Sequence, residues 1–401
     1  MLQVIIIPIL PLGVPSDLER YFYNREKDLK RLKNHLNALN EDVAEQILIT
    51  GYRGVGKTFL LKKMLNELPD NILVSYIDIS RVYGNQRGNL KEELIMQYLL
   101  NSMNEALKDS SGKLKNIYNT VNHFLSKISL KKYDFKEAGN ILGVAVPEGR
   151  NDYEKLSKFV MEFPQKVVES STNIQGFVIV IDKFQLIGEL ENPSSFFWLI
   201  RSYTQNQDNV SYIFTGSVSK TSEIIQMING QNGAFGGRMI QVNIDPFTQD
   251  ELQGYLNEKV GELKFTEDGF RRFYECTRGI PAYINSFCNT MSSGEVYNSE
   301  KIKETFFEKM DQITVMWIQI WGTLSIHEKE IVISIVDKGP QKWNDLLKTV
   351  PVSRNTLAKY LDILKNKGIV VFSDQDGYKI EEKMLEAWIK HKKKVNGYYP
   401  P

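Results

Sequence analysis

The chain has 401 residues, of which 42% are hydrophobic and 25% charged, so its length indicates roughly two to three domains with a substantial core. Its 27 Gly, 13 Pro and 2 Cys exclude a disordered chain, a collagen-like repeat and a disulfide scaffold. The 50 Lys and Arg balance 49 Asp and Glu, which argues against a protein that coats nucleic acid over its whole surface. The balanced charge is compatible with a local patch of basic residues.

Residues 1–21 form an N-terminal extension that begins with the apolar run VIIIPILPL at residues 4–12. This run contains Pro8 and Pro11, follows no basic residue and is too short to span a bilayer. We therefore expect a cytoplasmic protein without a membrane partner. The segment itself is interpreted as an extra strand, with self-assembly as the alternative. Four His and two Cys at no ligand-like spacing argue against structural zinc, and Cys276 and Cys288 are interpreted as buried thiols.

Apolar runs that alternate with helical periodicity predict a parallel sheet covered by helices on both faces. The first run, residues 46–51 (QILITG), leads through a glycine-rich stretch into a helical segment. Four further strands are predicted, at residues 72–79, 177–182, 210–215 and 239–244.

After Pro246 the strand pattern ends and helical segments follow. Two stretches, residues 248–251 and 325–328, have the composition of capping boxes, in which a hydroxyl and a carboxylate satisfy free amides at a helix start. Two further helices and the run IVVFSDQDGYKI then suggest a winged helix with a hairpin wing. The predicted domains are an extension (1–21), an α/β core (22–246) with a helical insertion at about 101–150, a small helical domain (247–322) and a winged helix with a basic tail (323–401).

The glycine-rich stretch matches the phosphate-loop pattern G-x-x-x-x-G-K-[ST] in full, between a predicted strand and a predicted helix. Successive backbone amides of such a loop surround a phosphate, and the helix dipole favours its charge. Lys57 would reach the β- and γ-phosphates, and Thr58 would bind Mg²⁺. The predicted nucleotide-binding residues of the loop are Gly51, Tyr52, Arg53, Gly54, Val55, Gly56, Lys57 and Thr58.

Asp182 ends the apolar run FVIVID, which places a carboxylate at the carboxyl end of a buried strand. Ligands of open α/β sheets collect at this edge. We expect Asp182 to hold Mg²⁺ directly or through water, with a simple strand-end cap as the alternative.

Several motifs in the same order resemble the archaeal ATPase family, a branch of the AAA+/STAND P-loop NTPases related to Orc1/Cdc6 initiators. They are FYNRE at 22–26, the phosphate loop, IDKFQ at 181–185, YIFTGS at 212–217, GGR at 236–238 and RGIP at 278–281. The resemblance implies an α/β core whose five parallel strands have the order 5-1-4-3-2, followed by a helical lid and a winged helix. It also implies that adenine is held between core and lid.

The resemblance implies further site residues. Ser217 or Thr215 would be a sensor that hydrogen-bonds the attacking water or the γ-phosphate, with an ordinary turn hydroxyl as the alternative. Arg238 would read the γ-phosphate as an arginine finger does, with a surface salt bridge as the alternative. Amides at the helix start of Pro281 would face the nucleotide. The remaining nucleotide contacts would come from Arg25, Phe59 and Gly279.

One departure from the family concerns catalysis. Where the family usually has Asp-Glu-Phe-Gln, this chain has Asp182-Lys183-Phe184-Gln185, so the expected general base is absent. A positioned acid–base group contributes about 10²–10⁴ in rate. Beside a metal site the Lys183 charge is unfavourable unless it points at phosphate or pairs with Asp or Glu. Gln185 can orient a water, as a glutamine does in some GTPases, so slow hydrolysis is expected.

The predicted winged helix contains an amphipathic helix whose start presents Arg354, Asn355 and Lys359 as candidate contacts to duplex DNA. Residues 323–401 carry 14 Lys and Arg against 10 Asp and Glu, a modest basic excess that includes the tail HKKK at 391–394. Asp362 on the same face weakens this interpretation because its carboxylate would face phosphates. An intramolecular or protein-binding role is the alternative for this module.

Three functional hypotheses follow. The first is an ATP-binding switch that uses Mg²⁺ and hydrolyses ATP to ADP and phosphate. The second is a DNA-binding regulator or initiator-like protein in which ATP is mainly structural. The third is a signalling scaffold that self-associates or binds a protein partner when ATP is bound.

Overall fold

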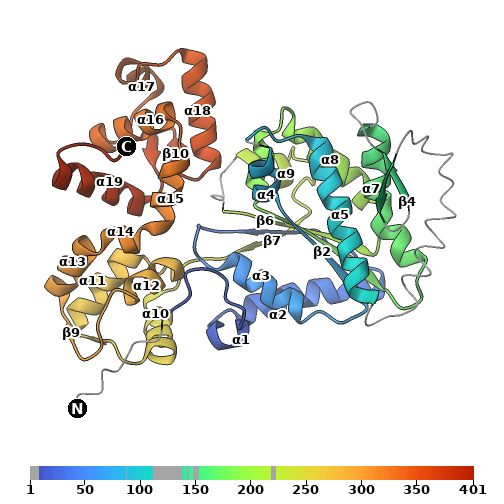
Figure 1. Cartoon of the computed structure of the whole chain (residues 1–401), viewed down its shortest axis with the longest axis horizontal. Coiled ribbons are helices and arrows are strands. Elements are labelled where there is room, and N and C mark those ends of the chain that lie inside the picture. The colour runs from blue at the N-terminus through green and yellow to red at the C-terminus, as the bar shows by residue number, and fades with distance from the viewer. Residues whose placement is uncertain (1–8, 87, 112–137, 142–143, 148–152, 218–222) are drawn as a thin grey trace. The chain divides into compact units, whose positions relative to one another are not determined.

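The computed structural model describes residues 9–86, 88–111, 138–141, 144–147, 153–217 and 223–401 (Figure 1). Their contacts divide them into two compact units. The sheet unit comprises Arg25–Thr50 and Lys57–Asn243, and the C-terminal unit comprises the described residues up to Asn24, the loop Gly51–Gly56 and Ile244–Pro401.

The sheet unit is built on five strands that pair only in parallel, in the order β2-β5-β6-β1-β7. Read from the other edge, this is the predicted order 5-1-4-3-2, which is therefore confirmed. The observed strands differ from the predicted ones by one residue at some ends: β1 (Ile47–Thr50), β2 (Ile72–Asp78), β5 (Gly176–Asp182), β6 (Val210–Thr215) and β7 (Ile240–Asn243).

Helices cover both faces of this sheet, which is why its central strands are buried along their whole length and mostly apolar. Every residue of β5 and β6 is buried. Alternate residues, including Phe177, Ile179 and Phe214, belong to one apolar core with residues of helices on one side. Figure 1 shows α5 (Glu92–Ser111), α7 (Tyr153–Glu169) and α8 (Pro193–Thr204) on that side, and α2 (Glu26–Asn37) and α3 (Lys57–Asn66) on the other. The unit also contains α4 (Ile79–Asn85), α9 (Glu223–Asn229) and the 3-10 helices Ala38–Glu41 and Phe184–Glu189.

The predicted helical insertion at 101–150 is described only in part. Residues 101–111 continue α5, and β3 (Ala138–Ile141) pairs antiparallel with β4 (Val144–Pro147). Residues 112–137, 142–143 and 148–150 lie outside the described part of the chain.

The C-terminal unit is mainly helical, and two of its helices begin at the predicted capping boxes. Thr248 and Glu251 bond each other's backbone amides at the start of α10, and Ser325 and Glu328 do so at α16. The helices that precede α16 surround large buried side chains such as Phe287 and Trp317. They are α10 (Gln249–Tyr255), α11 (Glu267–Thr277), α12 (Pro281–Cys288), α13 (Ser299–Glu308), α14 (Met310–Ile313) and α15 (Val315–Thr323), with a π-helical turn at Leu256–Val260 and the short strands β8 (Lys264–Phe265) and β9 (Val296–Tyr297).

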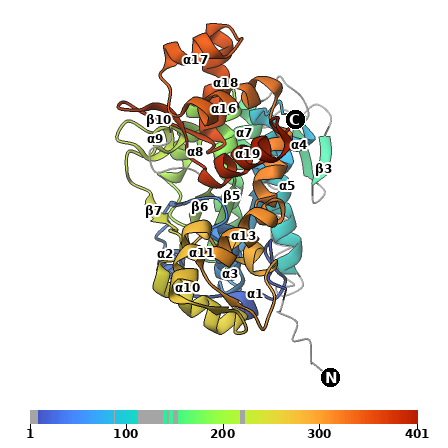
Figure 2. The same ribbon diagram turned by 90° about the vertical axis from the view of Figure 1, so that its left-hand side faces the viewer.

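The last part of the chain forms four helices and the predicted hairpin. Ser353 caps α18 through the amide of Thr356, and β10 pairs antiparallel with β11. Figures 1 and 2 show α16, α17 and α18 grouped with β10. Their bounds are α16 (Ile326–Lys338), α17 (Trp343–Thr349), α18 (Arg354–Asn366), β10 (Val370–Ser373), β11 (Gly377–Ile380) and α19 (Lys383–Asn396).

The described part of the N-terminal extension is held by the side chains of Asn285 in α12 and Asn289 directly after it. Asn289 bonds both the amide and the carbonyl of Leu10, at 2.8 and 2.9 Å, and Asn285 donates to the carbonyl of Pro11 at 2.9 Å. Leu10 is buried in the apolar core of the C-terminal unit. Residues 9–17 form no strand and are followed by the short helix α1 (Leu18–Tyr21), whereas residues 1–8 of the expected extra strand lie outside the described part.

No helix within the described ranges is long and apolar enough to cross a membrane. Both cysteines are free thiols; Cys288 is buried and Cys276 is half-buried.

Gln46, just before β1, links β1 to β6 through its side chain. Its amide nitrogen donates to the carbonyl of Val210 at 3.2 Å, and its amide oxygen accepts from the amide of Tyr212 at 2.7 Å. We predict that Gln46→Ala destabilises the sheet unit by about 2 kcal/mol, because two buried backbone groups lose their partners. Faster amide hydrogen exchange in a peptide covering 210–215, together with a lower urea midpoint, would demonstrate this. Gln253→Ala, at an exposed helical position, serves as the control, and equal effects of the two changes would contradict the prediction.

Candidate functional site

The glycine-rich loop takes a backbone conformation that only glycine adopts easily. Gly51, Gly54 and Gly56 all have positive φ, at 144°, 85° and 95°. A Cβ on Gly51 would lie 2.3 Å from the carbonyl oxygen of Ile244, and one on Gly54 would lie 2.8 Å from Cβ of Ala282. The predicted phosphate-loop pattern therefore matches a real backbone requirement at these positions. Val55 of the same loop is buried.

Lys57 begins α3 and is buried, with 6% of its surface exposed. Its ammonium group donates to Ser217 Oγ at 2.9 Å. Ser217 follows the end of β6, so the structure brings together two residues that the sequence analysis assigned to the γ-phosphate. The other sensor candidate, Thr215, is fully buried, and within the described residues its hydroxyl has no hydrogen-bond partner. Of the two hydroxyls, Ser217 is the one in contact with Lys57.

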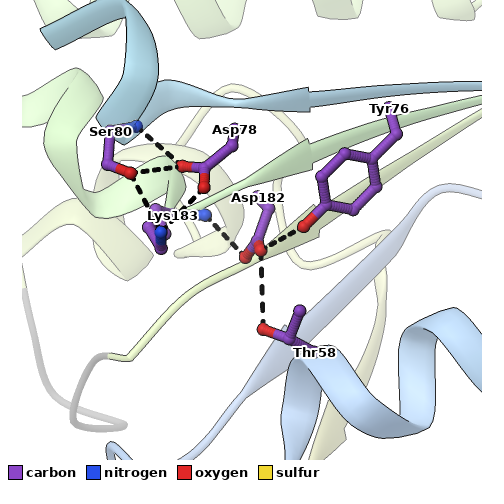
Figure 3. A network of polar contacts seen from close by, with 6 residues as sticks. All are labelled: Thr58, Tyr76, Asp78, Ser80, Asp182 and Lys183. Carbon is purple, nitrogen blue, oxygen red and sulfur yellow. Dashed lines mark hydrogen bonds and ion pairs between the residues drawn. The ribbon is translucent and has the colours of Figure 1, made fainter. Parts of the chain in front are cut away.

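Asp182 lies at the carboxyl end of β5, 3% exposed, and its carboxylate connects α3 to two strands (Figure 3). Asp182 Oδ2 accepts from the hydroxyl of Tyr76 at 2.5 Å and from Thr58 Oγ1 at 3.5 Å, whereas Oδ1 accepts from the amide of Lys183 at 2.8 Å. Burial raises the pKa of Asp182 above its ordinary value, although the hydrogen bonds from Tyr76 and Lys183 oppose this.

The two predicted metal ligands, Thr58 and Asp182, thus point at each other. Magnesium is commonly held by one or two protein oxygens together with substrate phosphates rather than by a full protein cage. Within the described ranges, no three His, Cys, Asp or Glu side chains converge as a metal cluster. The donor set of one hydroxyl and one carboxylate therefore fits Mg²⁺ that arrives with a nucleotide.

Lys183, which stands where the family has glutamate, is turned toward the neighbouring strand. It has a left-handed backbone, with φ of 58°, and its ammonium donates to Asp78 Oδ2 at 2.7 Å and to Ser80 Oγ at 2.9 Å. Asp78 ends β2 and caps α4 by accepting from the amide of Ser80 at 2.9 Å. Burial raises the pKa of Asp78, but the hydrogen bonds from Lys183 and Ser80 outweigh it, so this pKa lies below its ordinary value. The sequence analysis predicted that Lys183 points at phosphate or pairs with Asp or Glu. In the structure it pairs with an aspartate, Asp78.

Gln185 is buried, and its side-chain oxygen has no hydrogen-bond partner within the described residues. It lies against the turn that precedes Ser217, because a Cβ on Gly216 would be 2.3 Å from this oxygen. An unsatisfied buried acceptor costs about 1–3 kcal/mol. A water or ligand proton at this position would remove that penalty.

Other predicted residues lie elsewhere. Arg25 caps no amide with its side chain and approaches Asp28 at 3.9 Å at the start of α2. Arg238 is exposed near Arg201, whose pKa is lowered by burial and by the Arg238 charge. Among the described residues Arg238 makes no ion pair, so the salt-bridge alternative finds no partner there. Phe59 is half-buried in the first turn of α3.

In the C-terminal unit, the glycine-rich loop contacts the start of α12. Gly54 accepts a hydrogen bond from the amide of Ala282 at 3.1 Å, and Pro281 occupies the first position of that helix. The amide that follows Pro281 is therefore used by the loop carbonyl. Gly279, with φ of 69°, bonds the amide of Phe247 at 2.7 Å through its carbonyl.

Two loop side chains also lie in the C-terminal unit. The guanidinium of Arg53 lies 5.8 Å from the ring centre of Trp317, and burial lowers its pKa. Tyr52 is partly exposed, and burial and the neighbouring Glu381 raise its pKa. Both residues fill variable positions of the motif, so sequence reasoning assigned them to the nucleotide without these contacts.

The candidate DNA contacts Arg354, Asn355 and Lys359 are all exposed on α18. Asp362, which weakened that prediction, forms an ion pair with Lys365 at 2.9 Å. The basic tail, in contrast, belongs to α19, where two of its three lysines bond acidic residues. Lys392 pairs with Asp311 at 2.6 Å and Lys393 with Asp337 at 2.9 Å.

Sequence reasoning missed Tyr76 and Asp78. The run ILVSYIDI predicted a strand, but its aspartate was treated as part of that strand. The signal was available for Asp78, because SYID and IVID both place an aspartate after an apolar strand. Tyr76 gave no such signal, since its role depends on which strand lies beside β2.

Comparisons with solved structures find the same fold. A Walker-type ATPase of Pyrococcus abyssi is 18% identical with a TM-score of 0.58, over 94% of this chain and 98% of that one. Weaker likenesses include Aeropyrum pernix Orc1 in complex with DNA, 14% identical over 96% of each chain with a TM-score of 0.46. The Thermotoga maritima RuvB Holliday junction branch migration motor is 15% identical over 98% of this chain and all of that one, with a TM-score of 0.41.

A comparison with curated protein sequences finds no significant match. Residues 22–287, however, match the family described as an ATPase domain predominantly from Archaea. This range contains the phosphate loop, Asp182, Ser217 and the RGIP segment, so the predicted resemblance is confirmed. The chain is a P-loop protein of the α/β class with a helical C-terminal region, and it belongs to the archaeal ATPase family.

Proposed function

We propose that this protein is a molecular switch that binds ATP with Mg²⁺ and hydrolyses it slowly to ADP and phosphate. The observation that carries the proposal is the buried Lys57 ammonium, which lies on Ser217 while the next residue, Thr58, meets Asp182. An ammonium on a hydroxyl, and a second hydroxyl on a carboxylate, support the roles of phosphate ligand, sensor and metal ligands that we propose for these residues.

In this proposal each group has one task. The loop from Gly51 to Thr58 donates amides to the phosphates, and Lys57 moves from Ser217 to the β- and γ-phosphates. Thr58 and Asp182 hold Mg²⁺, which would offset charge that develops on the phosphates. Gln185, whose side-chain oxygen is buried and unsatisfied, would orient the attacking water by accepting a hydrogen bond from it. Arg238, exposed and near Arg201, would reach the γ-phosphate from a second copy or after a rearrangement.

We also propose the sense in which the protein is a switch. The same loop contacts Ala282 and Trp317, so a phosphate that fixes the loop would bias the C-terminal unit. The preference for adenine comes from family membership alone, and competition between ATP and GTP would test it.

We predict that Lys57→Ala weakens binding of Mg²⁺-ATP about 10- to 100-fold, because a charge-assisted hydrogen bond to phosphate is worth about 1.5–3 kcal/mol. Titration calorimetry on the full chain measures this, with a parallel series in EDTA to reveal the part that depends on the metal. Lys62→Ala is the matched control, since Lys62 lies on the same helix and is exposed. Equal affinity of Lys57→Ala and wild type would rule out phosphate binding by this loop.

A second function, DNA binding by α18, is favoured by the exposed row Arg354, Asn355 and Lys359 and by the pairing of Asp362 with Lys365. Opposed to it, Lys392 and Lys393 already have acidic partners. Because these two lysines of α19 are paired, the basic charge of residues 323–401 that is available to DNA would lie mainly on the exposed face of α18.

If α18 binds DNA, Arg354→Ala with Lys359→Ala will lower the affinity for duplex DNA and reduce the slope of log affinity against log salt by about 2, one phosphate contact each. Fluorescence anisotropy at about 50–200 mM salt measures both quantities. Lys390→Ala with Lys394→Ala on α19 is the control for a general loss of charge. If the wild type does not bind duplex DNA at about 50 mM salt, DNA binding by α18 is refuted and only the nucleotide-dependent switch remains.

A further inference from the structure

We infer that Asp78 supplies the catalytic carboxylate that the chain lacks at position 183, and that Lys183 is the residue that positions it. The inference rests on the proposed function, because it concerns hydrolysis of the nucleotide bound at Lys57 and Thr58. It assigns to the end of β2 a task that the family's sequence pattern places after the end of β5.

The register of the sheet puts Asp78 in place for this task. β2 and β5 are parallel neighbours, and Asp78 pairs directly with Asp182. Because side chains aligned in adjacent parallel strands share a face, the two carboxylates leave the sheet on the same side and at the same edge. Figure 3 shows them side by side, with Thr58 and Tyr76 approaching Asp182 and Lys183 approaching Asp78.

The hydrogen bonds of Asp78 leave one acceptor position available. Asp78 Oδ1 accepts twice from Ser80, from the amide at 2.9 Å and from the hydroxyl at 2.6 Å. Asp78 Oδ2 accepts from Lys183 at 2.7 Å, and a carboxylate oxygen has two lone pairs. Its second lone pair can therefore take a proton from a water molecule, while Ser80 and Lys183 hold the carboxylate in a single orientation.

The position of Lys183 explains why a cation replaces glutamate beside the candidate metal site. Its left-handed backbone turns the side chain to β2, where its charge is matched by Asp78. Together Asp78, Asp182 and Lys183 carry a net charge of one negative unit. A site with glutamate in place of Lys183 beside both aspartates would carry three, which would repel the nucleotide more strongly.

The proposed step transfers one proton. The oxygen of water attacks the γ-phosphorus while its proton passes to Asp78 Oδ2. The bond between the γ-phosphorus and the bridging oxygen breaks, and ADP leaves with that electron pair. The proton then passes from Asp78 to the released phosphate, which returns the carboxylate to its ionised form.

The test is single-turnover phosphate release by the full chain, with Mg²⁺-ATP affinity measured separately. Asp78→Asn should slow release about 100-fold or more and leave affinity within a fewfold of wild type. Asparagine is as good a helix cap as aspartate, so α4 keeps its cap in this variant. Lys183→Met keeps the carboxylate but frees it to rotate, and should slow release about tenfold. Asp208→Asn, an exposed aspartate of the same unit, is the control.

A double variant makes the inference specific. Asp78→Asn with Lys183→Glu moves the carboxylate to the family's usual position and should recover at least tenfold of the rate lost in Asp78→Asn. Lys183→Glu alone would place two carboxylates together and is therefore a poorer test of the missing base. If Asp78→Asn does not fold, Asp78→Ser keeps a capping oxygen and replaces it.

Three outcomes would overturn the inference. Asp78→Asn or Asp78→Ser that releases phosphate within threefold of wild type would show that Asp78 is dispensable. If Asp78→Asn with Lys183→Glu releases phosphate no faster than Asp78→Asn alone, the loss of the carboxylate does not explain the slow release of Asp78→Asn. A wild type that binds Mg²⁺-ATP but does not hydrolyse it would refute the catalytic role and leave the nucleotide-binding switch intact. Absence of binding would instead refute the proposed function.

Discussion

The parallel register of three strands is the constraint on which the candidate site depends. Asp78, Asp182 and Thr215 are the last residues of β2, β5 and β6, and the pairing aligns them in one row. Since successive side chains of a strand alternate between its faces, a slip of β5 by one residue would replace Asp182 in this row by an isoleucine. The continuous burial of β5 makes such a slip costly, because it would move the carboxylate into the apolar layer on the opposite face.

Electrostatics then determines what this row can do. Two neighbouring carboxylates, one of them 3% exposed, would repel each other and a nucleotide if nothing offset them. Lys183 neutralises Asp78 through a contact that is partly open to solvent, whereas no lysine or arginine forms an ion pair with Asp182 among the described residues. In the proposed function, lysine in place of glutamate would therefore favour binding of a polyanionic ligand more than rapid turnover. A carboxylate whose pKa is lowered by its partners is also a weaker base, which is consistent with slow chemistry.

Much of this arrangement could be predicted from the sequence because its signals are local. The spacing of Gly51, Gly56 and Lys57 identifies the loop. The alternation of apolar runs with helical periodicity predicts a parallel sheet, and the resemblance to the family supplies the order of its strands. The destination of Lys183 could not be predicted, since it depends on the pairing of β2 with β5, which are separated by about a hundred residues. For the same reason Tyr76 was missed, although the aspartate that ends SYID could have been noticed beside the one that ends IVID. The basic tail gave a misleading local signal, because its acidic partners Asp311 and Asp337 lie 81 and 56 residues away.

The loop itself places a limit on how nucleotide binding can act on the C-terminal unit. A ligand shifts an equilibrium only by the difference between its affinities for the two states, so it must change something that the loop contacts. The contacts available are the hydrogen bond from Ala282 to Gly54 and the packing of Arg53 on Trp317. Trp317 donates a hydrogen bond to Tyr283, which bonds the buried Glu382 at 2.9 Å, and Glu382 caps α19. A phosphate that reorients Gly54 would therefore act first on the start of α12 and then on the cap of the last helix. A change of one or two kcal/mol in these few bonds is enough to shift the population about five- to thirtyfold.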